Sequence, residues 1–146
     1  MVDPEVPRVE CYRAEFGRYV LMVQDEGSAS LTHPDFPDLT IVLAHGGRGW
    51  WYDAAAFMTL MRENVWIEVS GLPPKKLPKY YSRYNFESLA QKMIFGTDWP
   101  GVPGLKNNAL ALLELGLDPE TVELILHENA SRLYKLDAKQ DGATRN

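Results

Sequence analysis

Cysteine is almost absent from this sequence, since Cys11 is the only one among 146 residues. A single cysteine can form neither an internal disulfide nor a metal site built from several thiolates. Nothing in the cysteine content therefore points to an oxidising compartment, and we expect a protein of the reducing cytoplasm.

Long hydrophobic runs and an excess of positive charge are also lacking. No apolar run approaches the roughly 20 residues that cross a bilayer, and residues 1–5 lack the basic start and apolar stretch of a secretion signal. The 15 Lys and Arg are outnumbered by 20 Asp and Glu, with both signs scattered along the chain, for a net charge of −5. We therefore expect a soluble, untargeted protein that binds neither nucleic acid nor a membrane.

The hydrophobic content of 45% is enough for one ordinary core. Nearly continuous apolar and β-branched segments predict strands at residues 39–44, 65–69 and 93–95, typical of a parallel sheet that is covered on both faces. Between them, apolar residues at three- and four-residue spacings predict a helix from Trp51 to Arg62. A second helix is expected from about Ser82 to Gln91.

The remaining segments carry weaker patterns. The apolar run Tyr19–Val23 stops at a polar stretch and could be a strand followed by a turn. The proline-rich residues 73–78 are expected to form a loop.

Two more helices are expected near the C-terminus. Asn107 or Asn108 can cap a helix that runs to Leu115, with Gly116 as its stop. Asp118 followed by Pro119 then starts a closing helix, because Asp is a good N-cap and proline is tolerated in the first turn.

A histidine, a serine and an aspartate each follow one of the predicted strands: His45, Ser70 and Asp98. In a parallel sheet the carboxyl ends of the strands meet at one edge, where reacting groups collect. We therefore expect these side chains at the same rim. Gly46, Gly47 and Gly96 would let the backbone approach a ligand closely. A strand-end histidine bound to local backbone and a turn aspartate remain the structural alternatives.

Four strings of the sequence resemble the last part of amidohydrolase-related TIM-barrel enzymes. They are residues 41–47 (IVLAHGG), 64–71 (NVWIEVSG), 94–100 (IFGTDWP) and 125–133 (ILHENASRL). This branch includes the aminocarboxymuconate-semialdehyde and resorcylate decarboxylases and hydrolases of lactones and other cyclic substrates.

The resemblance covers residues 34–136. It leaves a poorly matched segment at residues 1–33 and a polar tail, expected to be flexible, at residues 137–146. It implies an α/β fold that is the C-terminal part of a TIM barrel, with about three parallel βα units that cannot close a barrel alone.

The resemblance also implies roles for individual residues. Asp98 would bind a divalent metal, zinc or manganese, and handle the proton of the attacking water, while His45 would polarise or protonate the substrate. Apart from the resemblance, Arg48 in the loop after His45 could meet a substrate carboxylate, with a solvated loop arginine as the more common alternative. Trp51 and Trp99 could line the pocket, although aromatics at such places are more often core or subunit contacts.

Most of the metal ligands of this family are missing. Its first-strand His-x-His pair and its fifth-strand histidine have no counterpart. The three histidines here are His33, His45 and His127, of which we interpret His127 as structural. A catalytic zinc needs about three protein ligands. We therefore expect no tight metal binding by this chain alone.

These observations favour a hydrolase or decarboxylase of a small, possibly cyclic, carboxylate, lactone or amide, present here as a truncated or split half. The partner would then be a complementing N-terminal half of the barrel. The alternative is a non-catalytic remnant that forms a homodimer through the open edges of the barrel. An unrelated small α/β binding module is a third, weaker possibility.

Overall fold

The computed structural model describes residues 9–13, 19–23, 39–49, 51–100 and 104–136. The predicted tail at residues 137–146 and most of the segment 1–33 lie outside the described residues. No helix in the described segments is long and apolar enough to cross a bilayer.

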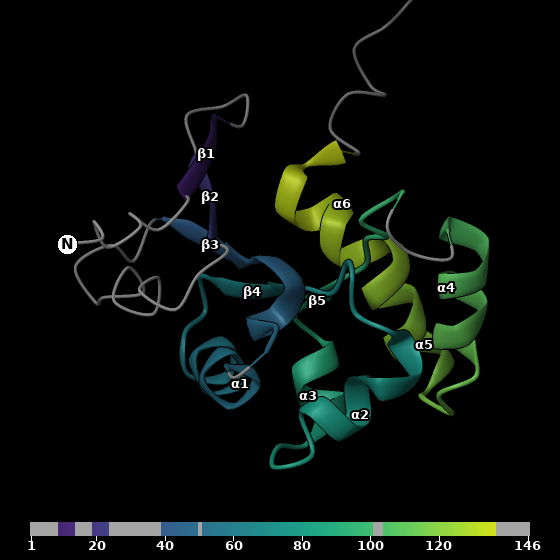
Figure 1. Cartoon of the computed structure of the whole chain (residues 1–146). Coiled ribbons are helices and arrows are strands. Elements are labelled where there is room, and N and C mark those ends of the chain that lie inside the picture. The colour runs from purple at the N-terminus through teal and green to yellow at the C-terminus, as the bar shows by residue number, and fades with distance from the viewer. Residues whose placement is uncertain (1–8, 14–18, 24–38, 50, 101–103, 137–146) are drawn as a thin grey trace, which may run out of the picture.

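A five-stranded sheet forms the centre of the described part, with its strands in chain order (Figure 1). The strands are β1 (Val9–Arg13), β2 (Tyr19–Val23), β3 (Thr40–Leu43), β4 (Val65–Glu68) and β5 (Met93–Ile94). β1 pairs with β2 antiparallel, and β2 to β5 are all parallel to their neighbours. The three predicted parallel strands are thus confirmed as β3, β4 and β5, and the run at residues 19–23 adds a fourth. The sheet is open, since β1 and β5 each pair on one side within the described residues.

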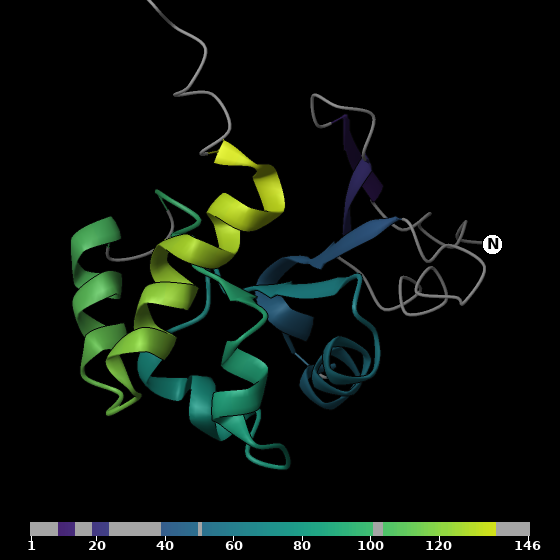
Figure 2. The ribbon, with the colours of Figure 1, turned by 180° about the vertical axis from the view of Figure 1, so that it is seen from behind.

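One face of β3 and β4 contributes to the main hydrophobic core. Ile41 lies opposite Val65, and Leu43 lies opposite Ile67. Three of these side chains are fully buried and Leu43 nearly so. The helices α1 (Tyr52–Met61), α2 (Leu77–Tyr80) and α3 (Phe86–Ala90) lie on the same side of the sheet (Figures 1 and 2).

The other face of the sheet is covered in part by α6 (Asn129–Tyr134), the last helix of the described residues. Val42 and Ile94 form a small second cluster, against which Trp66 packs. Ala130 and Leu133 of α6 cover this cluster. The near-continuous apolar sequence of β3 follows from this burial on both faces.

Two local predictions were wrong. The proline-rich segment expected to be a loop forms the 3₁₀ turn η3 (Pro74–Lys76) followed by α2. Proline is tolerated in the first turn of a helix, because the backbone N–H that it lacks would have no partner within the helix there. The expected caps Asn107 and Asn108 lie inside α4 (Leu105–Leu113), which starts after Gly104. Asn108 is buried within that helix, and Asn107 is exposed on it.

The closing helix is one continuous element of three parts. It runs from α5 (Pro119–Glu123) through the π-helical turn η4 (Leu124–Glu128) into α6. Asp118 occupies the predicted N-cap position, although its side chain makes no capping hydrogen bond. Asn129 is fully buried, and its side-chain N–H donates to the carbonyl oxygen of Met93 at 2.8 Å. This bond fixes the helix to β5.

Tyr81 connects the helical layer to the loop that follows β3. Its side chain is fully buried and its hydroxyl donates to the carbonyl oxygen of Gly46 at 2.6 Å. Burial raises the pKa of this phenol, with smaller contributions from Tyr52 and Glu68, so the hydroxyl stays protonated and can donate. A Cβ at Gly46 would lie 2.0 Å from the Tyr81 hydroxyl oxygen, and the φ of +54° also favours glycine.

We expect Tyr81→Phe to lower the free energy of unfolding by about 1–3 kcal/mol, because the buried Gly46 carbonyl loses its donor. Tyr84→Phe is the matched control, since the Tyr84 hydroxyl also donates to a carbonyl, that of Asp53 at 3.1 Å, but is only partly buried. Water can replace that bond, so a smaller loss is expected. Urea unfolding measures the free energy of unfolding of both variants. Equal losses in Tyr81→Phe and Tyr84→Phe would contradict the stabilising role of the buried Tyr81–Gly46 hydrogen bond.

Candidate functional site

His45 and Asp98 lie at the same edge of the sheet. His45 follows β3 and Asp98 follows β5, and both strands run parallel to β4, which lies between them. Both residues have a φ of +57°, in the left-handed region that few non-glycine residues adopt. Such backbone conformations persist where the surrounding structure holds them, and they cluster at functional sites.

A buried carboxylate lies between the ends of β3 and β4. Glu68, the last residue of β4, is 9% exposed. Its Oε1 accepts the backbone N–H of Ser70 at 2.7 Å, and its Oε2 accepts the Ser70 hydroxyl at 2.7 Å. The backbone N–H of His45 approaches Oε2 at 3.4 Å. Three donors from two loops thus satisfy the charge and tie the two strand ends together.

The imidazole of His45 is held against this carboxylate. Its Nδ1 lies 2.9 Å from the carbonyl oxygen of Ser70, 3.2 Å from the Ser70 hydroxyl oxygen and 4.0 Å from Oε2 of Glu68. The side chain is 21% exposed. One edge of the ring is therefore fixed by the protein.

Arg48 links the loop after β3 to Asp98. Its Nη2 lies 3.4 Å from Oδ2 of Asp98 and donates to the carbonyl oxygen of Gly71 at 3.3 Å. Both charged side chains are about half exposed, at 51% and 45%. An ion pair this exposed adds little stability.

Glycines permit this close packing at the strand ends. A Cβ on Gly96 would lie 2.2 Å from Oε1 of Glu68 and 2.9 Å from Cβ of Ser70. A Cβ on Gly71 would lie 2.1 Å from Nη2 of Arg48 and 2.6 Å from Oδ2 of Asp98. The predicted close approach of Gly96 is therefore to the protein's own carboxylate.

The two tryptophans of the predicted site are exposed. Trp51, just before α1, is 39% exposed, and Trp99, next to Asp98, is 76% exposed. Neither belongs to the hydrophobic core, and contact with a substrate remains a prediction for both.

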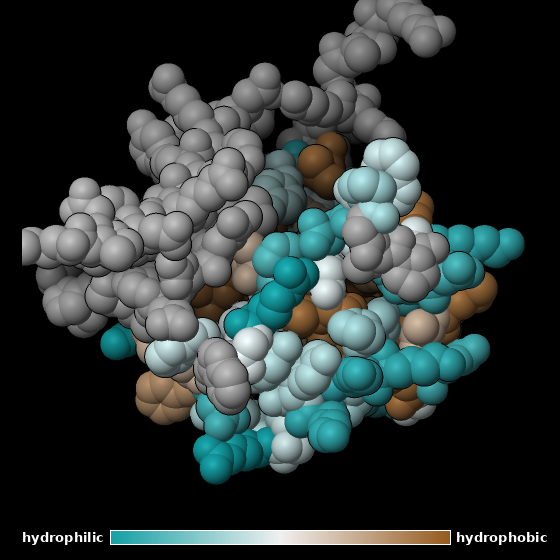
Figure 3. Space-filling view, in the orientation of Figure 1, coloured by the Kyte–Doolittle hydropathy of each residue, from teal (hydrophilic) through white to brown (hydrophobic). Residues whose placement is uncertain are grey.

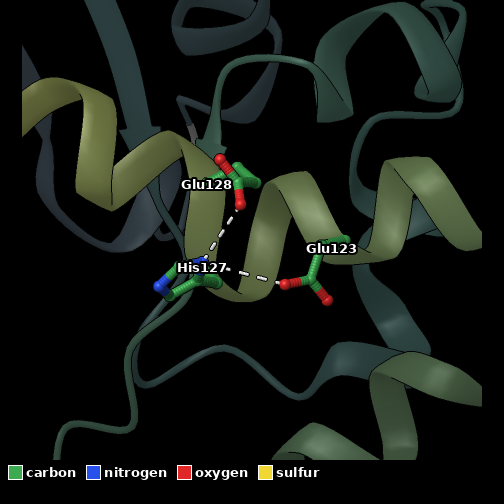
Figure 4. Close-up of side chains that lie close together, drawn as sticks. All are labelled: Glu123, His127 and Glu128. Carbon is green, nitrogen blue, oxygen red and sulfur yellow. Dashed lines mark hydrogen bonds and ion pairs between the residues drawn. The ribbon is translucent and has the colours of Figure 1, made fainter. Parts of the chain in front are cut away.

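The rim residues do not fit a metal on their own. In the described segments, one group of three residues brings potential metal-ligating atoms within 4.8 Å of one another: Glu123, His127 and Glu128 on the closing helix (Figure 4). All three are exposed, and Nδ1 of His127 lies 3.7 Å from Oε1 of Glu123 and 3.3 Å from Oε1 of Glu128. At the rim, the carboxylate of Glu68 is already occupied by donors, which leaves His45 and Asp98 as possible ligands.

Glu68 and Tyr81 were missed by the sequence interpretation, and Ser70 was noted only for its position. A glutamate at the end of an otherwise apolar strand is the signal that could have indicated Glu68, because a buried charge needs donors around it. Nothing in the sequence pattern indicates that Tyr81 reaches the loop after β3.

Comparisons with known proteins bear on the family and the fold of the chain. The profile of the Amidohydrolase family matches residues 11–136. An uncharacterised TIM-barrel protein from Bordetella bronchiseptica has a similar structure, with 29% identity and a TM-score of 0.60 over 82% of this chain and 46% of that one. None of the curated proteins compared with the chain matches it.

Two decarboxylases share the fold at lower identity. They are 2,6-dihydroxybenzoate decarboxylase from Rhizobium (24% identity, TM-score 0.55) and a dihydroxybenzoic acid decarboxylase from a Polaromonas species with bound manganese (19%, TM-score 0.52). Each match covers 70% of this chain and 36% of the other. The chain thus spans less than half the length of each of these three solved structures.

We expect Gly96→Ala to lower the free energy of unfolding by about 1–3 kcal/mol, because the added methyl group overlaps the Glu68 carboxylate. Glu68→Asp withdraws the carboxylate by one methylene, so the cost of Gly96→Ala should fall in that background. Gly116→Ala is the control: its Cβ would meet nothing within 4 Å, although its φ is +74°. Its cost should not depend on residue 68. Thermal unfolding of the six proteins checks this, and a cost of Gly96→Ala that Glu68→Asp leaves unchanged would contradict the packing.

Proposed function

The chain belongs to the Amidohydrolase family, and we propose that it supplies the C-terminal, proton-handling half of a metal-dependent hydrolase or decarboxylase of small carboxylates. The observation that carries the proposal is the placement of His45 and Asp98 at the carboxyl ends of two parallel strands, on either side of Glu68. The remaining barrel strands would come from a second polypeptide or from coding sequence that this chain lacks.

The substrate we propose is a small, possibly cyclic, carboxylate, lactone or amide. Two structures with the same fold are decarboxylases of dihydroxybenzoic acids, which are small aromatic carboxylates. Arg48 supports this substrate class, because its half-exposed guanidinium at the rim matches the geometry of a carboxylate. Trp51 and Trp99 would provide apolar surface for a ring.

His45 and Asp98 would divide the proton transfers. The imidazole is held at one edge and is partly exposed, as a group that gives a proton to the substrate or takes one from it must be. Asp98 is exposed and paired only loosely with Arg48, so its carboxylate can accept a proton. A divalent metal, zinc or manganese, would belong to the completed barrel, because the described rim residues do not form a three-ligand site.

The alternative is a folded remnant that forms homodimers. Large hydrophobic side chains are exposed on α1 and α4, and Figure 3 shows such residues over both helices among hydrophilic ones. They are Phe57, Leu60 and Met61 of α1, with Leu105, Leu110 and Leu113 of α4. Light scattering on the purified chain tests this alternative: a dimer is expected if these surfaces pair, and a well-folded monomer would count against it.

The main proposal is tested by adding the missing half. We expect the coding sequence directly upstream to contain a reading frame with a His-x-His pair. Co-expression with that polypeptide should raise bound manganese or zinc from substoichiometric to at least one ion per complex. The complex should release carbon dioxide from 2,6-dihydroxybenzoate or hydrolyse a simple lactone. One tightly held ion in this chain alone would contradict the role of the partner.

Within that complex, we expect Asp98→Asn and His45→Gln each to lower kcat by about 10²–10⁴-fold, the usual contribution of a group that transfers protons. His127→Gln is the matched control, because His127 is exposed on the closing helix and its substitution should leave turnover unchanged. Turnover is followed by carbon dioxide release or lactone opening. Unchanged kcat in Asp98→Asn would rule out the role assigned to that carboxylate.

A further inference from the structure

We propose that Glu68 and Ser70 are positioning residues that hold His45 as the Nδ1–H tautomer and present its Nε2 atom, as a proton acceptor, to the rim. The tautomer follows from the contacts of the imidazole and is independent of any activity. Its meaning for catalysis rests on the proposed function.

The backbone contact of the imidazole determines which nitrogen carries the proton. Nδ1 of His45 lies 2.9 Å from the carbonyl oxygen of Ser70, a normal hydrogen-bond distance. A carbonyl oxygen can only accept a hydrogen bond. The proton of the neutral ring therefore lies on Nδ1, and Nε2 carries the lone pair. Within the described residues, Nε2 has no hydrogen-bond partner.

The carboxylate of Glu68 orients the Ser70 hydroxyl. The Ser70 hydroxyl oxygen lies 2.7 Å from Oε2 of Glu68 and 3.2 Å from Nδ1 of His45. An ionised carboxylate only accepts hydrogen bonds, so the hydroxyl proton points to Glu68 and the hydroxyl oxygen faces Nδ1. The chain of donors then runs from His45 through Ser70 to Glu68. The carbonyl oxygen and the hydroxyl oxygen of Ser70 thus both favour a proton on Nδ1 of His45.

This direction excludes a serine nucleophile activated by His45. In a nucleophilic pair the histidine nitrogen accepts the hydroxyl proton. Here Nδ1 donates, and the Ser70 proton points away from the ring. The His45–Ser70–Glu68 cluster is therefore a device that orients an imidazole. It resembles the usual arrangement in which one ring nitrogen is fixed by a hydrogen bond so that the other can act.

The tautomer can be read directly from the ring nitrogens by nuclear magnetic resonance. A long-range ¹H–¹⁵N spectrum of the labelled full chain at pH about 9, where an ordinary imidazole is neutral, should show His45 protonated at Nδ1. His33→Gln and His127→Gln variants assign the signals of the three histidines. A wild-type spectrum in which Nε2–H is the major form would overturn the proposal.

Glu68→Gln tests the role of the carboxylate. Its amide NH₂ would donate to the Ser70 oxygen, which leaves the hydroxyl free to donate to Nδ1. We expect the ratio of Nε2–H to Nδ1–H to rise about tenfold, the equivalent of about 1.4 kcal/mol. The double variant Glu68→Gln/Ser70→Ala lacks the hydroxyl and should return towards the wild-type ratio. A wild-type ratio in folded Glu68→Gln would refute the role of Glu68.

Ser70→Ala alone keeps the carbonyl and should keep Nδ1–H as the major form. If Glu68→Gln does not fold, the wild-type and Ser70→Ala spectra decide, since Nε2–H as the major form in either would refute the anchoring of Nδ1. Failure of the proposed function would appear in the turnover measurement and not in the tautomer. In that case the tautomer is as expected, while the complex with an N-terminal half shows no turnover that depends on Asp98.

Discussion

The buried carboxylate of Glu68 is the constraint around which this site is built. A charge with so little exposure is tolerated only where hydrogen-bond donors surround it. The Glu68 carboxylate accepts hydrogen bonds from the backbone N–H groups of His45 and Ser70 and from the Ser70 hydroxyl. Those donors come from residues that follow β3 and β4. The same contacts that satisfy the charge therefore fix the conformation of His45 and the path of the chain at Ser70. Gly96 leaves the space that the carboxylate needs.

The described rim brings three polar side chains of different chemistry to one edge of the sheet, those of His45, Arg48 and Asp98. The imidazole is fixed at Nδ1, and the carboxylate and the guanidinium are about half exposed; we propose that these groups move protons and bind an anion. In these residues the rim lacks the cluster of nitrogen and oxygen ligands that would hold a metal tightly. Solved structures of the same fold are more than twice as long as the part that this chain matches.

The errors of sequence interpretation have physical causes that are specific to each segment. Proline was interpreted as a loop former at residues 73–78, but the first turn of a helix has unpaired N–H groups and tolerates it. Asn108 was interpreted as a cap because asparagine is common there, but it is buried inside α4. In both cases a local preference allowed two structures, and the helical one is the one in which Leu77 and Asn108 are buried.

Hydrophobic runs and chain order were enough to predict the strands β3, β4 and β5, their parallel arrangement and the placement of His45 and Asp98 at one edge, because these features are encoded locally. Which groups touch became clear only from the folded chain. Glu68 meets His45 across 23 residues, and Tyr81 meets Gly46 across 35. Such contacts depend on strand register and on helix packing, which no local pattern encodes. The orientation of the imidazole is a consequence of the fold.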